Sequence, residues 1–131
     1  MTEVFADTYY WLALLNRKDP YHAKVSAYEY EGSLVTHWGI AVEVFDALAQ
    51  PNWRIGAMQF WSEVHAEPDV VLLPLDEALL ERAVSLYSQR PDKGWSLTDC
   101  VSFIVMRDRG IALALTGDHH FEQAGFQIAF K

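Results

Sequence analysis

The sequence contains one cysteine, Cys100, among its 131 residues. A single sulfur cannot form an internal disulfide or a cysteine-based zinc site, because both need several cysteines. Glycine and proline are also scarce, with 7 and 5 copies scattered along the chain. A chain with so little of either is neither a fibrous repeat nor a disordered segment. We therefore expect a compact protein of an intracellular compartment.

Long apolar runs are missing as well. The longest run near the N-terminus lies within "YYWLALL" and is far too short to span a bilayer. The N-terminus also carries an acid, Glu3, where a signal peptide would carry basic charge. We expect no membrane segment and no targeting segment, and therefore a cytoplasmic location.

Basic residues are fewer than acidic ones. The chain has 10 Lys and Arg residues against 18 Asp and Glu residues, and its net charge is -8 at pH 7. This balance argues against a protein that holds nucleic acid through a broad basic surface. It does not exclude a nuclease, because a cluster of acids that binds cations adds negative charge, and the bound metal reverses the local sign.

Apolar side chains, by contrast, are abundant. They make up 51% of the residues, and aromatic side chains make up 14%. A chain of this length buries roughly two thirds of its unfolded surface in one core. We therefore expect a single domain over residues 1–131.

Short apolar runs, typical of buried strands, alternate with segments of helical spacing. The expected strands cover residues 3–7, 34–37, 70–75, 111–116 and 126–130. Helices are expected over residues 8–16, 20–32, 38–50, 51–65, 77–89 and 96–110, with a short helical turn at 117–125. Parallel strands need crossover connections, so this alternation predicts an α/β fold with a parallel sheet and helices on both faces.

Four acids fall where such a sheet collects its ligands, outside the carboxyl ends of the strands. Asp7 follows the first expected strand, and Asp118 follows the fourth after one glycine. Asp99 begins a helix expected at the same edge, and Glu43 lies early in the helix after the second strand. These acids are far apart in the sequence, and we expect them to meet at one edge of the sheet.

A group of unpaired carboxylates indicates a cation site. Acids held together raise one another's pKa, so the cluster is favourable only with cations between its members. Hard oxygen ligands suit Mg²⁺ or Mn²⁺. One or two such ions can orient a water and stabilise the leaving oxygen when a phosphodiester is displaced in line.

Each acid taken alone also fits a structural role. Asp7 fits a helix N-cap, Asp118 a turn, and Glu43 a solvated helix face. Asp99 follows Ser96 by three residues, which is the pattern of a capping box, and an acid in the first turn suits the helix dipole. These roles stay open for single residues, whereas the convergence of all four favours a site.

Several segments together carry a recognisable pattern. They are "FADTYYWLALLNRKDP", "AVEVFDAL", "SLTDCVSFIVMRDRGI" and "ALTGDHHFEQAGF". The chain resembles a PIN domain over nearly its whole length, and specifically a VapC-like toxin ribonuclease. The last two segments are the most specific, because the acid, the flanking Thr, the following aromatic and their spacing match the family's pattern.

The resemblance implies a three-layer α/β/α sandwich with a central parallel sheet and an acidic pocket for Mg²⁺ or Mn²⁺. It implies that Asp7 and Asp99 are the principal metal ligands and that Asp118 and Glu43 complete a catalytic site. Thr8 and Thr116 match hydroxyl positions beside the pocket. It also implies an RNA substrate, a homodimer, and a cognate antitoxin that holds the toxin inactive.

Some residues depart from the family's pattern or invite other roles. The first helix starts with aromatic residues, Tyr9 to Trp11, where small ones are expected. His119 and His120 stand where a basic residue is common; adjacent residues of a helical turn point about 100° apart, so we expect both on the surface. Trp95, in the loop before the Asp99 helix, is the best candidate for stacking on a base. Cys100 is expected to be a small buried hydrophobe.

The sequence thus predicts a Mg²⁺-dependent endoribonuclease that is the toxin of a toxin-antitoxin pair. One alternative is a phosphoryl-transfer enzyme on a similar sheet, which fits poorly because Tyr9 occupies the position where such a site carries a second Asp. The other alternative is a PIN-like module that binds RNA or a protein without catalysis.

Overall fold

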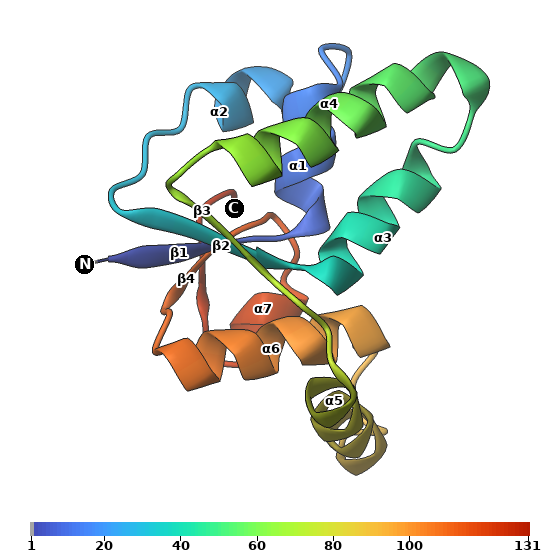
Figure 1. Ribbon diagram of the computed structural model, residues 1–131. Coiled ribbons are helices and arrows are strands. Elements are labelled where there is room, and N and C mark those ends of the chain that lie inside the picture. Colours follow the sequence, from blue (N-terminus) through green and yellow to red (C-terminus); the bar gives the residue numbers. More distant parts are fainter. Residues whose placement is uncertain (1) are drawn as a thin grey trace.

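A central sheet lies between two layers of helices in the computed structural model, which describes residues 2–131 (Figure 1). All strand pairings are parallel, and the strand order is β3-β2-β1-β4-β5. The strands are β1 (Glu3–Ala6), β2 (Ser33–His37), β3 (Val70–Leu73), β4 (Leu113–Leu115) and β5 (Gln127–Ile128). The predicted three-layer α/β/α fold with a parallel sheet is confirmed.

The helices divide between the two faces of the sheet. They are α1 (Thr8–Leu15), α2 (His22–Ser26), α3 (Trp38–Ala47), α4 (Arg54–Ala66), α5 (Glu77–Gln89), α6 (Leu97–Arg109) and α7 (His120–Gln123), with a 3-10 turn, η1 (Pro51–Trp53), before α4. Figure 1 shows α1 to α4 on one side of the sheet and α5 to α7 on the other. On that second side α5 packs on α6. No helix within residues 2–131 is long and apolar enough to cross a membrane.

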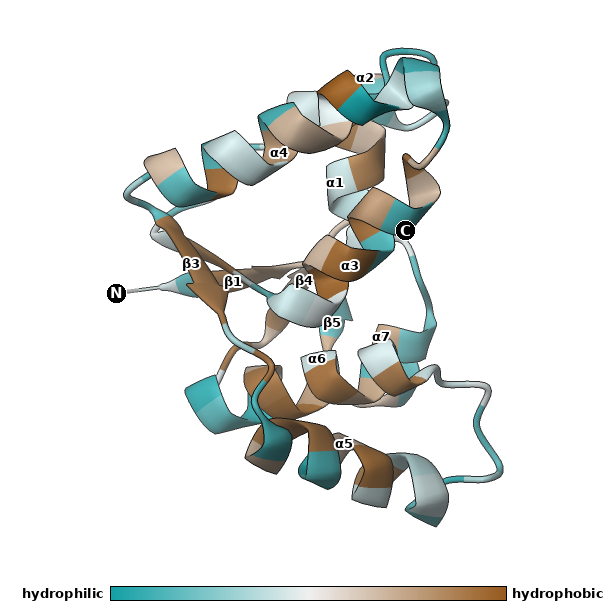
Figure 2. Ribbon diagram, turned by 45° about the vertical axis from the view of Figure 1, so that its right-hand side comes forward, coloured by the Kyte–Doolittle hydropathy of each residue, from teal (hydrophilic) through white to brown (hydrophobic). Residues whose placement is uncertain are grey.

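The core lies on both faces of the central strands. The side chains of Val4, Phe5 and Ala6 in β1 are buried, which explains an apolar run without alternation. Seven consecutive residues of α6, Cys100 to Met106, are buried as well. Figure 2 shows the apolar residues that run along β3 and α6. The buried position predicted for Cys100 is confirmed.

The segment between α1 and β2 differs from the prediction. The helix expected over residues 20–32 forms only as α2. Gly32 has a φ of +80°, and a Cβ at this position would lie 1.8 Å from the carbonyl oxygen of Thr2. The backbone of Ser33 then donates to the same oxygen at 3.0 Å. Because the chain must pass this close to the start of β1, it leaves the helix early and enters β2 extended.

The parallel strands bring three chain exits to one edge of the sheet. Asp7 separates β1 from α1, β2 runs directly into α3, and Thr116 follows β4. Because β1 pairs with both β2 and β4, these exits are neighbours. The fold therefore supplies the edge at which the sequence places its acids.

Candidate active site

Asp7 lies buried at the carboxyl end of β1. It occupies the N-cap position of α1, but its side chain makes no capping hydrogen bond. Its Oδ2 instead accepts a hydrogen bond of 2.9 Å from Oγ1 of Thr116. The capping role considered for Asp7 is therefore wrong, because its side chain makes no capping hydrogen bond and its Oδ2 is held from the end of β4.

Two threonine hydroxyls fix three of the acids. Oγ1 of Thr116, which is fully buried, donates to Asp7 and accepts from the backbone N–H of Asp118 at 3.0 Å. Oγ1 of Thr8, the first residue of α1, donates to Oε1 of Glu43 in α3 at 2.5 Å. Each hydroxyl thus links two chain segments, so the carboxylates of Asp7 and Glu43 and the backbone of Asp118 are held in place.

Asp99 is a helix cap and a member of the acidic group at once. Its backbone N–H donates to Oγ of Ser96 at 3.0 Å, and its Oδ2 accepts from the backbone of Ser96 at 3.0 Å. The predicted capping box is therefore present. The same Oδ2 lies 3.3 Å from Nδ1 of His120. The cap sets the carboxylate at the start of α6, where it faces α7.

His120 joins Asp99 and Asp118 in a compact group. One ligand atom from each of the three lies within 4.8 Å of the others, the spacing of residues that share a metal ion. The prediction that both histidines lie on the surface is right for His119, whose side chain is 71% exposed, and wrong for His120, at 26%. Oδ1 of Asp118 accepts from the backbone of His120 at 2.9 Å, and this turn directs the ring towards α6.

Burial dominates the electrostatics of Asp7. It raises the pKa of this carboxyl to about 7, although hydrogen bonds from Thr116 and the Thr8 backbone act in the opposite direction. The negative charges of Asp99 and Glu43 raise the pKa further. The pKa of Asp7 therefore depends on the charges of two of the other predicted acids.

The pKa of Asp99 is also raised above its ordinary value. Burial raises its pKa, the backbone of Ser96 lowers it, the charge of Asp118 raises it and His120 lowers it. The acids thus form one electrostatic unit at the edge of the sheet, as the sequence predicts.

Among the described residues, no Lys or Arg side chain forms an ion pair with Asp7, Glu43, Asp99 or Asp118. Within residues 2–131 the ion pairs of Lys and Arg involve other acids, at Glu3, Asp92, Asp108 and Glu122. Among the basic side chains of this described part of the chain, only those of His119 and His120 approach Asp99 and Asp118. A buried carboxylate beside further carboxylates calls for a cation, and oxygen donors suit a hard divalent one. The residues present therefore fit a Mg²⁺ or Mn²⁺ site.

The position of Trp95 differs from what the sequence suggests. Trp95 is only 5% exposed, its indole N–H donates to Oε1 of Gln123 at 3.1 Å, and its ring packs edge-on against Phe103. It cannot stack on a base, so that prediction is wrong. In the sequence Trp95 directly precedes Ser96, an exposed helix cap, and this position does not predict that α7 covers the ring.

His37 was given no role from the sequence, yet it links two helices that carry acids. Its ring is fully buried, and Nδ1 accepts from the backbone of Gly39 at 3.0 Å, which caps α3. Its Nε2 lies 2.9 Å from Oγ of Ser102 in α6. Since Nδ1 accepts, Nε2 carries the proton. The only local signal is its place directly before a helix, where side chains that cap are common.

Comparison with known proteins agrees with this geometry. The sequence model described as PIN domain matches residues 4–127. A search of curated proteins gives no match. Among solved structures, Mycobacterium tuberculosis VapC20, described as a sarcin-ricin loop cleaving toxin, has a TM-score of 0.86 and 25% identity, with 94% of this chain and 95% of that chain covered.

Two further structures share the fold at lower identity. VapBC2 of Rickettsia felis, bound to a DNA fragment from its promoter, has a TM-score of 0.69 at 8% identity. VapBC-1 of nontypeable Haemophilus influenzae has a TM-score of 0.66 at 13% identity. In both comparisons 98% of each chain is covered. Together with the match over residues 4–127, these likenesses show that the chain belongs to the PIN domain family and is a VapC-like member of it.

Proposed function

We propose that this protein is a metal-dependent endoribonuclease and the toxin of a toxin-antitoxin pair. Membership of the PIN domain family and the likeness to a VapC toxin described as cleaving the sarcin-ricin loop support this proposal. The observation that carries it is the group of Asp7, Glu43, Asp99 and Asp118, which share one edge of the sheet without a Lys or Arg partner. Such a group has no evident use in a protein that never binds a cation.

Asp7 and Asp99 would hold a Mg²⁺ or Mn²⁺ ion, with Asp118 and Glu43 completing the site. A bound divalent cation lowers the pKa of water and stabilises the leaving oxygen of a phosphodiester. Hydroxyls of the chain keep the ligands in place: Thr116 fixes Asp7, and Thr8 fixes Glu43. Nδ1 of His120 lies 3.3 Å from Oδ2 of Asp99 and 3.4 Å from Oδ1 of Asp118, so this ring lies against both carboxylates.

The protein's own contribution to catalysis would be preorganisation. The capping box fixes the Asp99 carboxylate at the start of α6, and the Thr116 hydroxyl aligns the exits of β1 and β4. Ligands that are already in position need no rearrangement when substrate binds. RNA would lie across this edge of the sheet with the scissile phosphate facing the acids.

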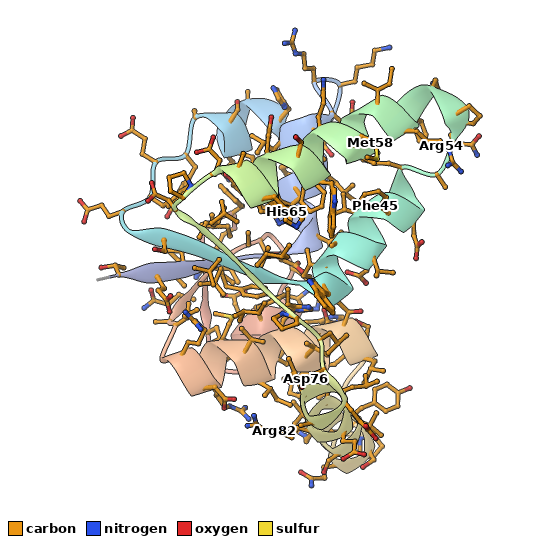
Figure 3. All side chains as sticks on the ribbon, viewed as in Figure 1. Phe45, Arg54, Met58, His65, Asp76 and Arg82 are labelled. Carbon is orange, nitrogen blue, oxygen red and sulfur yellow. The ribbon has the colours of Figure 1, made fainter. Side chains whose placement is uncertain are left out.

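A protein partner is the second part of the proposal. Exposed apolar side chains gather on α3 and α4, where Val42 is 59% and Met58 57% exposed. A groove of about 520 Å³ lies between α3 and α4, and Phe45 and Met58 are among the residues that line it (Figure 3). Exposed apolar patches mark protein contacts. Since two of the similar structures are described as VapBC, we propose a cognate antitoxin as one partner and a second copy of this chain as another.

Cleavage of RNA by the purified protein tests the enzymatic proposal. A structured RNA is incubated with wild-type protein in Mg²⁺, with wild-type protein in a chelator, and with Asp99→Asn in Mg²⁺. Asp46→Asn, an exposed acid on α3, is the matched control. We expect cleavage by the wild type and by the control in Mg²⁺ only. Equal cleavage in all the tubes would show that the activity does not come from this site.

A further inference from the structure

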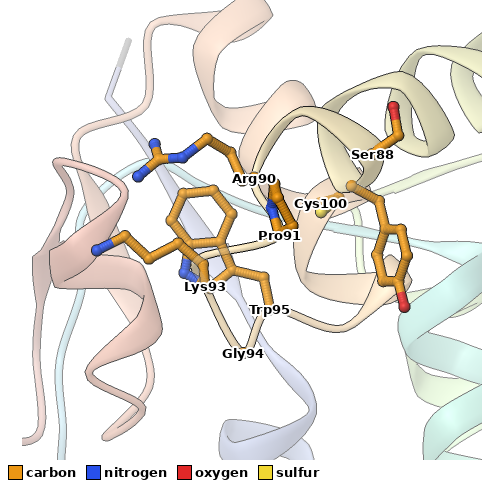
Figure 4. A pocket seen from close by; sticks show the side chains of 8 residues that line it. Ser88, Arg90, Pro91, Lys93, Gly94, Trp95 and Cys100 are labelled. Carbon is orange, nitrogen blue, oxygen red and sulfur yellow. The ribbon is translucent and has the colours of Figure 1, made fainter.

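A second hollow lies beside the acidic group, between the end of α5 and the start of α6. It has a volume of about 480 Å³ and no part in the proposed cation site. Figure 4 shows it from close by. The lining residues that matter here are Tyr87, Arg90, Lys93, Gly94, Trp95 and Cys100.

Two residues that line this cavity, Gly94 and Cys100, lie close to members of the acidic group. Cys100, on the cavity wall, directly follows Asp99. A Cβ placed on Gly94 would lie 3.8 Å from Nε2 of His120. Nδ1 of the same ring contacts Asp99 at 3.3 Å. The cavity and the acidic group are therefore neighbours.

The cavity is lined by two basic side chains, those of Arg90 and Lys93. Lys93 is partly buried, and within residues 2–131 it forms no ion pair, unlike Arg82, Arg90 and Arg109. The guanidinium of Arg90 lies 5.1 Å from the centre of the Trp95 ring. Arg90 is paired with Asp92, so Lys93 is the cation of this cavity that has no acidic partner among residues 2–131. A phosphate group is the ligand such a wall attracts.

The loop that carries these cations is fixed before any ligand arrives. Arg90 makes two hydrogen bonds of 3.0 Å to Asp92, and the backbone N–H of Lys93 donates to the carbonyl of Arg90 at 3.1 Å. Trp95 anchors the end of the loop through its bond to Gln123. A preformed site loses less entropy on binding than a mobile one.

An aromatic ring completes the cavity. Tyr87, near the end of α5, is 55% exposed and lines the hollow. Stacking on such a ring suits any base, because every base has a π face. We propose that this cavity binds the nucleotide adjacent to the scissile phosphate, with Lys93 on its phosphate and Tyr87 against its base. The inference rests on the proposed function, because it assumes that RNA crosses the acidic edge.

Binding of RNA without cleavage tests this inference. A fluorescein-labelled RNA hairpin is titrated with the Asp99→Asn protein at several salt concentrations, and fluorescence anisotropy is measured. Adding Lys93→Gln should weaken binding several-fold and reduce the slope of log K against log salt by about 0.7, the value for one phosphate contact of a single strand. Lys18→Gln, the same change at an exposed lysine of another loop, should leave both quantities unchanged.

Substitutions of Tyr87 test the stacking. In the same background Tyr87→Ala should weaken binding about tenfold, and Tyr87→Phe, which keeps the ring, should bind as before. In the cleaving protein, Lys93→Gln should raise KM and leave kcat unchanged, because the contact is made equally in ground and transition states.

The outcomes separate this inference from the proposed function. If Lys93→Gln and Lys18→Gln bind RNA with the same affinity and salt slope, or if no variant binds RNA, the cavity is not a nucleotide site, whether or not the wild type cleaves. If binding depends on Lys93 but the wild type never cleaves in Mg²⁺, the cavity assignment stands and the proposed catalysis fails.

Discussion

Replacing Asp7 with Asn should stabilise the metal-free protein, and the gain should grow with pH. Burial raises the pKa of Asp7 from 3.8 to about 7. Between these values the folded state keeps a proton that the unfolded state has lost, so the stability of the wild type falls as pH rises through this window. Asn carries no charge, and the variant escapes this loss.

The size of the effect follows from the pKa. Each pH unit within the window costs the wild type about 1.4 kcal/mol, so the loss between pH 5 and the folded-state pKa near 7 is about 3 kcal/mol. Asn also forfeits one of the two hydrogen bonds that Asp7 accepts, a fixed cost of about 1 kcal/mol. Because this cost does not depend on pH, the difference between variant and wild type still grows by about 3 kcal/mol from pH 5 to pH 8.

Urea unfolding in the presence of a chelator, from pH 5 to pH 8, gives the required free energies of unfolding. Asp46→Asn serves as the control, since this acid is exposed and its difference from the wild type should stay flat. A difference for Asp7→Asn that stays flat or shrinks with rising pH would refute the reasoning, because it would mean that Asp7 is ionised in the folded protein at no cost.

Three further outcomes are expected. Millimolar Mg²⁺ should raise the Tm of the wild type at pH 8, because a ligand of the folded state stabilises it, and most of the shift should vanish in Asp99→Asn; equal shifts would contradict the site. Thr116→Val should lower the free energy of unfolding by about 1–3 kcal/mol, since it leaves the Asp118 N–H and Asp7 without their partner, whereas Thr116→Ser should stay near the wild type in urea titrations. His37→Ala should cost about 2–3 kcal/mol at pH 7 through loss of the cap and of the contact with Ser102, and His37→Asn should recover about 1 kcal/mol through the cap alone. The deficit of His37→Ala should shrink below pH 6.5, because the folded-state pKa of His37 is lowered to about 3 and the wild type loses stability as its unfolded ring takes up a proton; a deficit independent of pH would contradict the buried neutral ring.

Local patterns in the sequence predict the sheet and the position of its acids. Continuous apolar runs identify the strands because both faces of the sheet are covered, and the alternation with helices fixes parallel pairing. Asp99 is placed correctly because its cap depends only on Ser96, three residues away. The single domain over residues 1–131 and the cytoplasmic location stay predictions.

Contacts between distant segments escape such patterns. His37 meets Ser102 across 65 positions of the chain, and Trp95 is covered by Gln123 from 28 positions away. His120 turns inward because Asp118 holds its backbone, a choice that spacing between adjacent residues cannot make. For His37 and Trp95, contacts with distant segments decide the burial of the side chain.

The hydrogen bond between Asp7 and Thr116 joins residues 109 positions apart. During translation Asp7 is synthesised early and Thr116 only after most of the chain. A nascent chain that ends before Thr116 therefore lacks one side of this edge of the sheet. Contacts this distant in sequence form only after a large loop has closed. Translation must therefore pass residue 120 before Asp7, Asp99, Asp118 and His120 can assemble.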